Sequence, residues 1–185
     1  MKKQKLNLRL GILLGILLLS ITVWLVYILM PDKNLSEMNW SVVDSHPKYF
    51  SQLDGRTVTS TEAQIPSIVV VMIDNSPDVY PQSCLGGAGG VVYEAPVEGV
   101  TTRFMQVMDS TTDLPKIGPV RSARAYYLDW LAEYGDDALY MHCGGAPEAL
   151  TLIKNRKIFN ANEFYWGSYY WRDQKKIAPH NLFTN

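Results

Sequence analysis

Hydrophobic positions along the chain form one long run near the N-terminus and several short runs further on. Residues 10–30 carry no charge over about 21 positions, which is the length that a helix needs to cross a bilayer. Residues 31–65 are polar, with Pro, Ser and Thr scattered through them, and predict a stalk or linker. From residue 66 on, short apolar runs alternate with turn residues. This pattern predicts a folded domain over residues 66–185.

Short apolar runs in this region predict β-strands. The segments SIVVVMIDN, GGVVYEAPVEG, TTRFMQVMD and ALYMHCGG are rich in β-branched or alternating apolar residues and stop at Asn, Gly or Asp. We expect the second and third segments to form a hairpin, because a turn containing Pro and Gly joins them.

Two further segments predict helices. Apolar residues from Ala123 to Tyr134 follow an i, i+4, i+7, i+8, i+11 spacing, which is one face of a helix. Ser122 is the expected N-cap of this helix and Gly135 its expected C-terminal stop. A second helix is expected in APEALTLIKN, residues 146–155, with proline at its first position. Strands that alternate with helices predict the α/β class: a mixed sheet with flanking helices and a binding site at the carboxyl ends of the strands.

Charge changes the interpretation of the apolar run over residues 10–30. Four of the 17 Lys and Arg precede it, and by the positive-inside rule residues 1–9 form a basic tail that stays in the cytoplasm. The run is longer than the apolar region of most cleaved secretory signals, and no small-x-small site ends it. We therefore expect an uncleaved transmembrane helix, with a cleaved signal as the alternative. The expected location is the cell membrane, single-pass, with the C-terminal domain extracytoplasmic.

The remainder of the chain is acidic. It carries 13 Lys and Arg against 18 Asp and Glu, a net charge of −5. A nucleic-acid-binding domain presents a basic face, so no nucleic-acid partner is expected. The sequence lacks the G-x-S-x-G and H-E-x-x-H signatures, and HCGGAPEAL lacks the Lys-Ser/Thr end of a Walker loop. Neither a cofactor nor a metal site is predicted, and the oligomeric state stays open.

Five ordered motifs carry a family resemblance. They are VVMIDNSPDVYPQS, VVYEAPVEGVTTRFM, KIGPVRSAR, GGAPEAL and WRDQKKIAPHNLF, and they are similar to the N-terminal part of the YerB-like lipoprotein family, a bacterial domain of unknown function. The resemblance covers residues 65–185 and implies an extracytoplasmic, membrane-attached α/β protein with a further C-terminal domain. It implies no reaction. Members are commonly tethered through a lipidated cysteine, whereas this chain has the apolar run over residues 10–30.

Cys84 and Cys143 are the two cysteines of the chain, at positions where the family usually has other small residues. Their paired appearance in an oxidising compartment predicts a disulfide. The bond would close a loop of about 60 residues, which the chain-entropy model values at roughly 4 kcal/mol. Two buried free thiols, or a metal site completed by His142, are the alternatives.

Polar residues at predicted strand ends and helix starts are the candidates for ligand binding. Arg121 and Arg124, beside the free N–H groups of a helix start, would hold a phosphate or a carboxylate. Alternatively they pair with Glu94, Glu98 or Asp109, and we expect the two arginines to be divided between these roles. The candidate ligand-binding residues are Asp74, Asn75, Glu94, Glu98, Arg103, Arg121, Ser122, Arg124, His142, Gly144, Gly145, Arg172 and Asn181.

His180 is the candidate catalytic residue, as a base close in sequence to Arg172 and Asp173. Most aromatic side chains of residues 160–185 are expected to pack against the domain, with the wall of a sugar pocket as the alternative. The predicted function is the binding of an anionic or glycan-type component of the cell envelope. Two alternatives stay open: an envelope hydrolase or transferase acting on glycan or phosphate-linked polymer, and an interaction protein without a small ligand.

Overall fold

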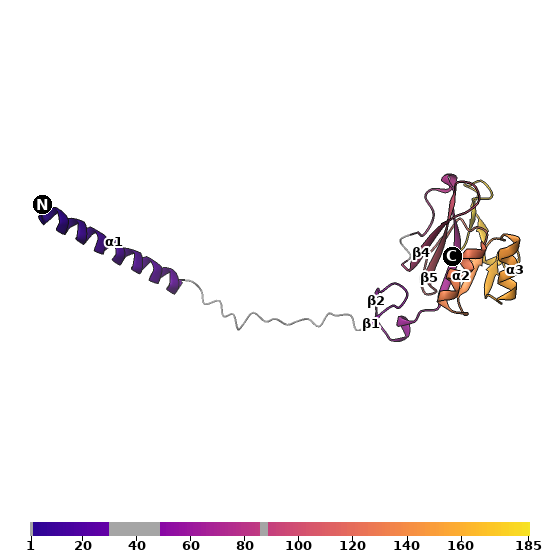
Figure 1. The fold of residues 1–185 in the computed structure, drawn as a ribbon, viewed down its shortest axis with the longest axis horizontal. Coiled ribbons are helices and arrows are strands. Elements are labelled where there is room, and N and C mark those ends of the chain that lie inside the picture. The colour runs from indigo at the N-terminus through magenta and orange to yellow at the C-terminus, as the bar shows by residue number, and fades with distance from the viewer. Residues whose placement is uncertain (1, 30–48, 86–88) are drawn as a thin grey trace. The chain divides into compact units, whose positions relative to one another are not determined.

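The structure is a computed structural model that describes residues 2–29, 49–85 and 89–185 (Figure 1). The chain divides into two compact units, Met1–His46 and Pro47–Asn185, each described here by itself. In the first unit, helix α1 spans Lys2–Leu29. None of the helices in the described ranges has both the length and the apolar character that a membrane span requires. The structure therefore does not confirm the expected transmembrane helix.

The second unit begins earlier than the sequence pattern predicts. Residues 31–48 of the expected linker lie outside the described residues. From residue 49 on, the chain belongs to the second unit, where β1 (Tyr49–Phe50) pairs antiparallel with β2 (Thr57–Val58). A 3₁₀ turn, η1 (Glu62–Gln64), follows this hairpin. The second half of the expected linker is thus part of the folded domain.

A five-stranded mixed sheet is the central element of the second unit, in the order β4-β5-β3-β6-β7. Strand β5 pairs antiparallel with both β3 and β4, whereas β6 pairs parallel with both β3 and β7. The four predicted strands and the predicted hairpin are confirmed, and β7 is an additional edge strand. The strand bounds are β3 (Ile68–Asn75), β4 (Val91–Pro96), β5 (Thr102–Asp109), β6 (Leu139–His142) and β7 (Asn160–Asn162).

Both predicted helices are present. Helix α2 (Ala125–Leu131) continues as a 3₁₀ turn to Gly135, which has a positive φ of 87° and ends the helical segment as expected. Helix α3 (Pro147–Asn155) has proline at its start, also as expected.

The predicted N-cap of α2 is wrong. Arg124, and not Ser122, precedes the first helical residue. The reason is that the chain stays extended up to this point: the Arg121 amide donates to the Met72 carbonyl (2.9 Å) and the Ala123 amide to the Gly144 carbonyl (3.0 Å). These bonds hold the segment along the sheet, so the helix begins at Ala125, two residues later than a cap at Ser122 requires.

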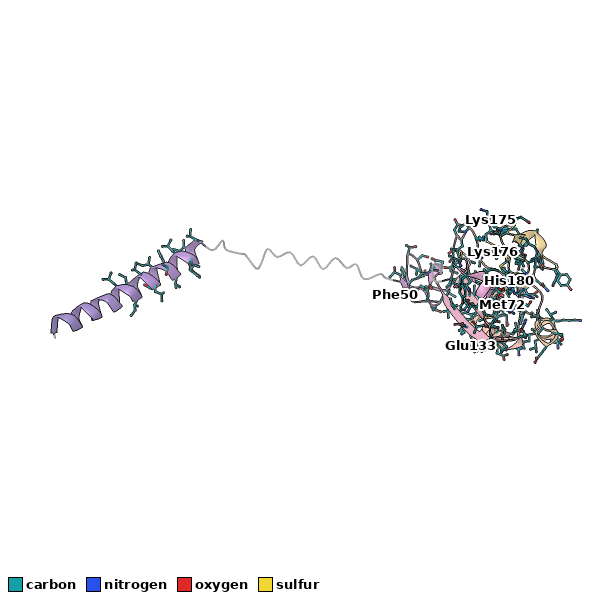
Figure 2. The ribbon with its side chains drawn as sticks, turned by 90° about the horizontal axis from the view of Figure 1, so that it is seen from above. Phe50, Met72, Glu133, Lys175, Lys176 and His180 are labelled. Carbon is teal, nitrogen blue, oxygen red and sulfur yellow. The ribbon has the colours of Figure 1, made fainter. Side chains whose placement is uncertain are left out.

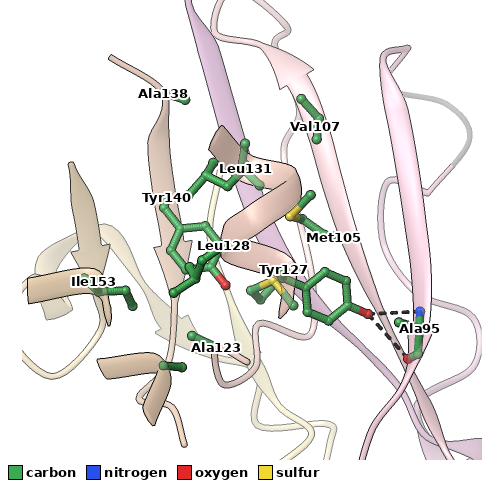
Figure 3. Close-up of a cluster of buried hydrophobic side chains, with 13 residues drawn as sticks. Ala95, Met105, Val107, Ala123, Tyr127, Leu128, Leu131, Ala138, Tyr140 and Ile153 are labelled. Carbon is green, nitrogen blue, oxygen red and sulfur yellow. Dashed lines mark hydrogen bonds between the residues drawn. The ribbon is translucent and has the colours of Figure 1, made fainter. Parts of the chain in front are cut away.

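Alternation along β3 sends side chains into two separate cores. Val70 and Met72 belong to the core under the helices, where Figure 3 shows Tyr127, Leu128 and Leu131 of α2 beside Met105 and Val107 of β5. Val71 and Ile73 belong to the other core. That second core also contains buried residues from irregular segments and from the end of the chain: Ile117, Val120, Tyr170 and Leu182.

The C-terminal segment differs from the prediction for its aromatic side chains. Strands β8 (Trp171–Arg172) and β9 (Leu182–Phe183) pair antiparallel, and Tyr170 and Phe183 are buried. The other aromatic side chains are exposed, so the expectation that most of them pack against the domain is wrong. Their segment follows β7, which is an edge strand of the sheet among the described residues. The exposed aromatic residues are Phe164, Tyr165, Trp166, Tyr169 and Trp171.

Candidate functional site

Asp74, at the carboxyl end of β3, lies in a cluster of charged groups. Its side chain is only 1% exposed. One carboxylate oxygen, Oδ2, accepts a hydrogen bond from Nδ1 of His180 at 2.6 Å and lies 3.0 Å from Nε of Arg121. The other, Oδ1, accepts hydrogen bonds from the backbone N–H (3.0 Å) and the hydroxyl (2.6 Å) of Ser76. Each oxygen of this carboxylate therefore has two close partners.

These partners determine the charge of Asp74. Burial by itself raises the pKa of the carboxyl. The hydrogen bonds from Ser76 and His180 and the positive charge of Arg121 outweigh burial and hold the pKa below its ordinary value of 3.8. Asp74 is consequently a carboxylate at neutral pH, even though it is almost fully buried.

Backbone pairing explains why residues so distant in the sequence meet here. The amide of Asp74 donates to the carbonyl of Pro119 at 2.8 Å, which holds the segment that carries Arg121 against the end of β3. His180 comes from the loop before β9, 106 positions after Asp74. That loop is attached by Lys176, whose Nζ donates to the carbonyl of Val79 at 3.1 Å. Lys176 and His180 of this loop are labelled in Figure 2.

Arg103 is the most buried cation of the cluster, with 4% of the residue exposed. It lies opposite Asp74 in the antiparallel register of β3 and β5. Its Nη1 donates to the carbonyl of Ser122 at 2.7 Å, whereas its buried Nε has no hydrogen-bond partner among the described residues. Burial and the charges of Arg124 and Arg121 lower the pKa of Arg103. The pKa falls because the guanidinium is desolvated and has like charges beside it.

Arg124 has a carboxylate partner of its own. Its Nε and Nη2 donate to the two carboxylate oxygens of Glu98 at 2.8 and 2.5 Å, which is a bidentate ion pair. These bonds are the main reason why the pKa of Glu98 is lowered to about 2. The predicted pairing of an arginine with Glu98 is thus confirmed for Arg124, whereas Arg121 pairs with Asp74.

The cluster carries an excess of positive charge. Arg103, Arg121 and Arg124 supply three positive charges, and Asp74 and Glu98 supply two negative ones, so one positive charge remains even with His180 neutral. The third carboxylate that the sequence suggested as a partner, Asp109, pairs instead with Arg56 at 2.9 Å.

Asn75 organises a second polar group beside this cluster. Its Nδ2 donates to Glu94 (3.0 Å) and to the hydroxyl of Thr102 (2.6 Å). Its Oδ1 accepts from the hydroxyl of Tyr80 (2.9 Å) and from Nε2 of Gln82 (2.6 Å). The candidate residues Asn75 and Glu94 are therefore brought together, and their polar groups are largely satisfied within the protein.

His142, Gly144 and Gly145 form the turn between β6 and α3. His142 is fully buried, with Nδ1 2.7 Å from the carbonyl of Gly144, and burial lowers its pKa. The amide of Gly144 donates to Oδ1 of Asn162 at 3.0 Å, and Gly145 pairs with Ala123 in an isolated bridge. The arrangement is that of a strand-to-helix turn, and the polar partners of the Asp74 side chain among the described residues are Ser76, Arg121 and His180 instead.

Arg172 and Asn181 support the loop that carries His180. Nη1 of Arg172 donates to Oδ1 of Asn181 at 3.0 Å, and its Nη2 lies 3.5 Å from Glu163. In the same loop, Asp173 accepts from Nζ of Lys116 at 2.5 Å. Arg172 and Asn181 thus position the loop, whereas His180 is the side chain that reaches the cluster.

The predicted disulfide is absent, because both cysteines are free thiols. The Cys84 thiol donates to the carbonyl of Lys116, and the Cys143 sulfur lies 3.6 Å from Oε2 of Glu163. Burial raises the pKa of both thiols, and the charge of Glu163 raises that of Cys143 further. Within the described part of the chain, no group of three or more His, Cys, Asp or Glu is arranged to hold a metal ion.

Ser76 is the site residue that the sequence pattern missed. It supplies both hydrogen bonds to Oδ1 of Asp74. Aspartate followed two residues later by serine at a strand end is typical of a turn in which the side chain bonds the backbone, so a local signal was present in DNS, residues 74–76.

Comparisons with known proteins agree with this fold. The family model described as the N-terminal domain of a protein of unknown function, DUF3048, matches residues 53–185. The crystal structure of the YerB protein from Bacillus subtilis is similar at 32% sequence identity, with a TM-score of 0.64 over 74% of this chain. The match covers 46% of the YerB chain, so this chain spans less than half the length of that protein. A search of curated proteins gave no significant match. The resemblance to the YerB-like family is therefore confirmed. Residues 53–185 match the N-terminal domain of the DUF3048 family, and the chain belongs to that family.

Proposed function

We propose that this protein is an extracytoplasmic, membrane-anchored domain that binds an anionic component of the cell envelope, and that Arg121 and His180 receive its phosphate or carboxylate group beside the buried charge of Arg103. The observation that carries the proposal is Arg103, a buried guanidinium whose Nε has no hydrogen-bond partner among the described residues. The support for the anchor and its orientation is the uncharged run over residues 10–30 behind a basic tail.

A bound anion would reduce two unfavourable features of this site: the excess positive charge of the cluster and the burial of the Arg103 guanidinium without a full set of partners among the described residues. A buried charge is unfavourable unless it is paired and hydrogen-bonded, and this cluster keeps one positive charge beyond its two carboxylates. Arg121 and His180 are 24% and 25% exposed, so both can contact a ligand in solution. Guanidinium groups also match the geometry of phosphate and carboxylate oxygens.

The experiment is calorimetric titration of the full chain with glucose 1-phosphate, and with glucose as the neutral control. We expect the phosphate ester to bind and Arg121→Gln to weaken its affinity about tenfold or more, since a charge-assisted hydrogen bond is removed. Arg156→Gln is the matched control, because Arg156 pairs with Asp129 on the surface at 2.8 Å and should leave binding unchanged. Equal affinity in wild type and Arg121→Gln would contradict the proposal.

A second candidate function is catalysis with His180 as general base, in a hydrolase or transferase acting on glycan or phosphate-linked polymer. The observation in its favour is the 2.6 Å hydrogen bond from Nδ1 of His180 to buried Asp74, which orients the ring and leaves Nε2 for a substrate. In that case His180→Gln abolishes turnover of a chromogenic phosphate ester or glycoside, while binding of glucose 1-phosphate persists. If neither turnover nor binding is measured, an interaction protein without a small ligand becomes the better description.

A further inference from the structure

A concave region lies between α3 and β7, and its residues differ from those of the arginine cluster. It is a groove of about 520 Å³. Leu150, Ile153 and Ile158 give it an apolar side. Trp166 and Asn160 line this groove and also a smaller cavity of about 160 Å³. Mostly apolar concavities with a few placed polar groups are typical of small-molecule sites.

Exposed aromatic rings form one wall of this groove. Trp166 is 48% exposed, and Tyr165 is more exposed still. The Trp166 ring lies 6.0 Å from that of Tyr169, between centroids. The faces of aromatic rings are negative, and they attract the weakly positive C–H groups on one side of a pyranose. The wall therefore offers a surface on which a sugar ring can stack.

Asn162 supplies a hydrogen-bond donor in the same groove. The residue is 5% exposed. Its Oδ1 accepts from the amides of Gly144 (3.0 Å) and Phe164 (3.4 Å), which fixes the orientation of the side chain. Among the described residues, its Nδ2 is not one of the buried polar atoms that lack a hydrogen-bond partner, and Asn162 lines the groove, so this donor is accessible from the groove. Because the amide is held in one orientation, its N–H groups can donate to an acceptor in the groove, such as a sugar hydroxyl.

The charge of the groove selects the kind of sugar. Lys154 and Lys157 line it, and none of the described lining residues is acidic. Neither lysine forms a salt bridge within the described ranges, so both ammonium groups can pair with a ligand carboxylate. The net charge of the chain is −1, which makes this basic groove a local feature.

We propose that this groove binds an acidic sugar unit, a pyranose that carries a carboxylate. The ring stacks on Trp166, Nδ2 of Asn162 donates to a ring hydroxyl, and Lys154 and Lys157 pair with the carboxylate. The proposal does not depend on the arginine cluster, since the two sites share no residue.

The experiment titrates the full chain with tetragalacturonate and with maltotetraose, a neutral tetrasaccharide, by calorimetry and by fluorescence. We expect tetragalacturonate to bind, maltotetraose to bind at least about tenfold more weakly, and added salt to weaken only the acidic probe. Trp166→Ala should lower the affinity for tetragalacturonate about tenfold or more. The double variant Lys154→Gln/Lys157→Gln should remove the preference for the acidic probe, and because both lysines are exposed its fold should be unchanged.

Two control variants separate this groove from the other site. Lys175→Gln changes an exposed lysine that does not line the groove and should leave binding of tetragalacturonate unchanged. Arg121→Gln should also leave it unchanged, whereas it weakens binding of glucose 1-phosphate. The proposal is overturned if wild type does not bind tetragalacturonate. It is also overturned if Arg121→Gln abolishes that binding, or if a folded Trp166→Ala variant, checked by circular dichroism, keeps it.

Discussion

Arg121 and Arg124 are only three positions apart, yet their side chains have different surroundings. Arg124 forms a bidentate pair with Glu98, so its charge is compensated. Arg121 lies 3.0 Å from Asp74, but its Nε makes no hydrogen bond of normal geometry. Asp74 also accepts from His180 and faces Arg103 across the strand pair, so several positive groups depend on one carboxylate. Substituting Asp74 therefore tests how much this one carboxylate stabilises the whole cluster.

We predict that Asp74→Asn lowers the free energy of unfolding by about 2–4 kcal/mol, because it leaves buried Arg103 and half-buried Arg121 without that counter-charge. Urea unfolding followed by circular dichroism measures the change. Asp129→Asn is the control: its pair with Arg156 is exposed, so the variant should stay within about 0.5 kcal/mol of wild type. A fully stable Asp74→Asn protein would show that the cluster is not held together by this carboxylate.

The turn from β6 to α3 shows how backbone conformation positions the site. Gly144 has a positive φ of 61°, and its carbonyl accepts from the amide of Ala123 at 3.0 Å. This bond holds the extended segment before α2, which carries Arg121. A Cβ on Gly144 would approach the Phe164 ring to 2.8 Å. Gly144, the first glycine of the pair that follows β6, is therefore required for its left-handed backbone conformation.

Gly144→Ala should destabilise the protein by about 1–2 kcal/mol, since a non-glycine residue is strained in the left-handed region. Thermal unfolding measures this change. Gly167→Ala, where a Cβ meets nothing within 4 Å, is the matched control and should have little effect. Adding Phe164→Ala to Gly144→Ala separates the two causes, because it removes the steric contact and keeps the backbone strain. An unchanged melting temperature in Gly144→Ala would exclude both causes.

The acid stability of the domain follows from carboxyl groups whose pKa is lowered on folding. Asp74 and Glu98 have ordinary pKa values of 3.8 and 4.5, and both are lower in the folded protein. The unfolded chain therefore takes up protons first as the pH falls. Stability from these groups is complete above the unfolded pKa values and is lost as the pH drops through the folded ones. For Glu98 the window extends from 4.5 down to about 2.

We predict that the urea concentration at the midpoint of unfolding decreases as the pH is lowered from 4.5 to 2. Glu98→Gln should make this decrease smaller. The contribution should be below about 1 kcal/mol, because the Glu98 side chain is 69% exposed and solvent screens its pair with Arg124. Unfolding curves measured at several pH values test the prediction, with Glu133→Gln as the surface control. The assignment is wrong if Glu98→Gln and Glu133→Gln have the same pH dependence.

Local sequence patterns were sufficient to predict most strands of the sheet and both helices of the domain. The β-branched run of β3, the glycine after α2 and the proline that opens α3 each act within a few residues. The same patterns failed at the start of α2, where long-range bonds to Met72 and Gly144 override the helix signal of Ser122. They also missed β7, whose three residues, NAN, resemble a turn.

Long-range packing assembles the candidate site, so the sequence could predict only part of it. Several of its residues could be named in advance because polar groups at strand ends are visible in the sequence. Their pairing could not, since Asp74 and His180 are 106 positions apart and no local period relates them. Antiparallel register placed Asp74 opposite Arg103, and backbone bonds brought Arg121 to the same strand end. The sequence alone thus determined which charged residues lie at the ends of the elements. The tertiary structure determined which of these charges pair, and that Nε of Arg103 has no hydrogen-bond partner among the described residues, because both depend on contacts between residues far apart in the chain.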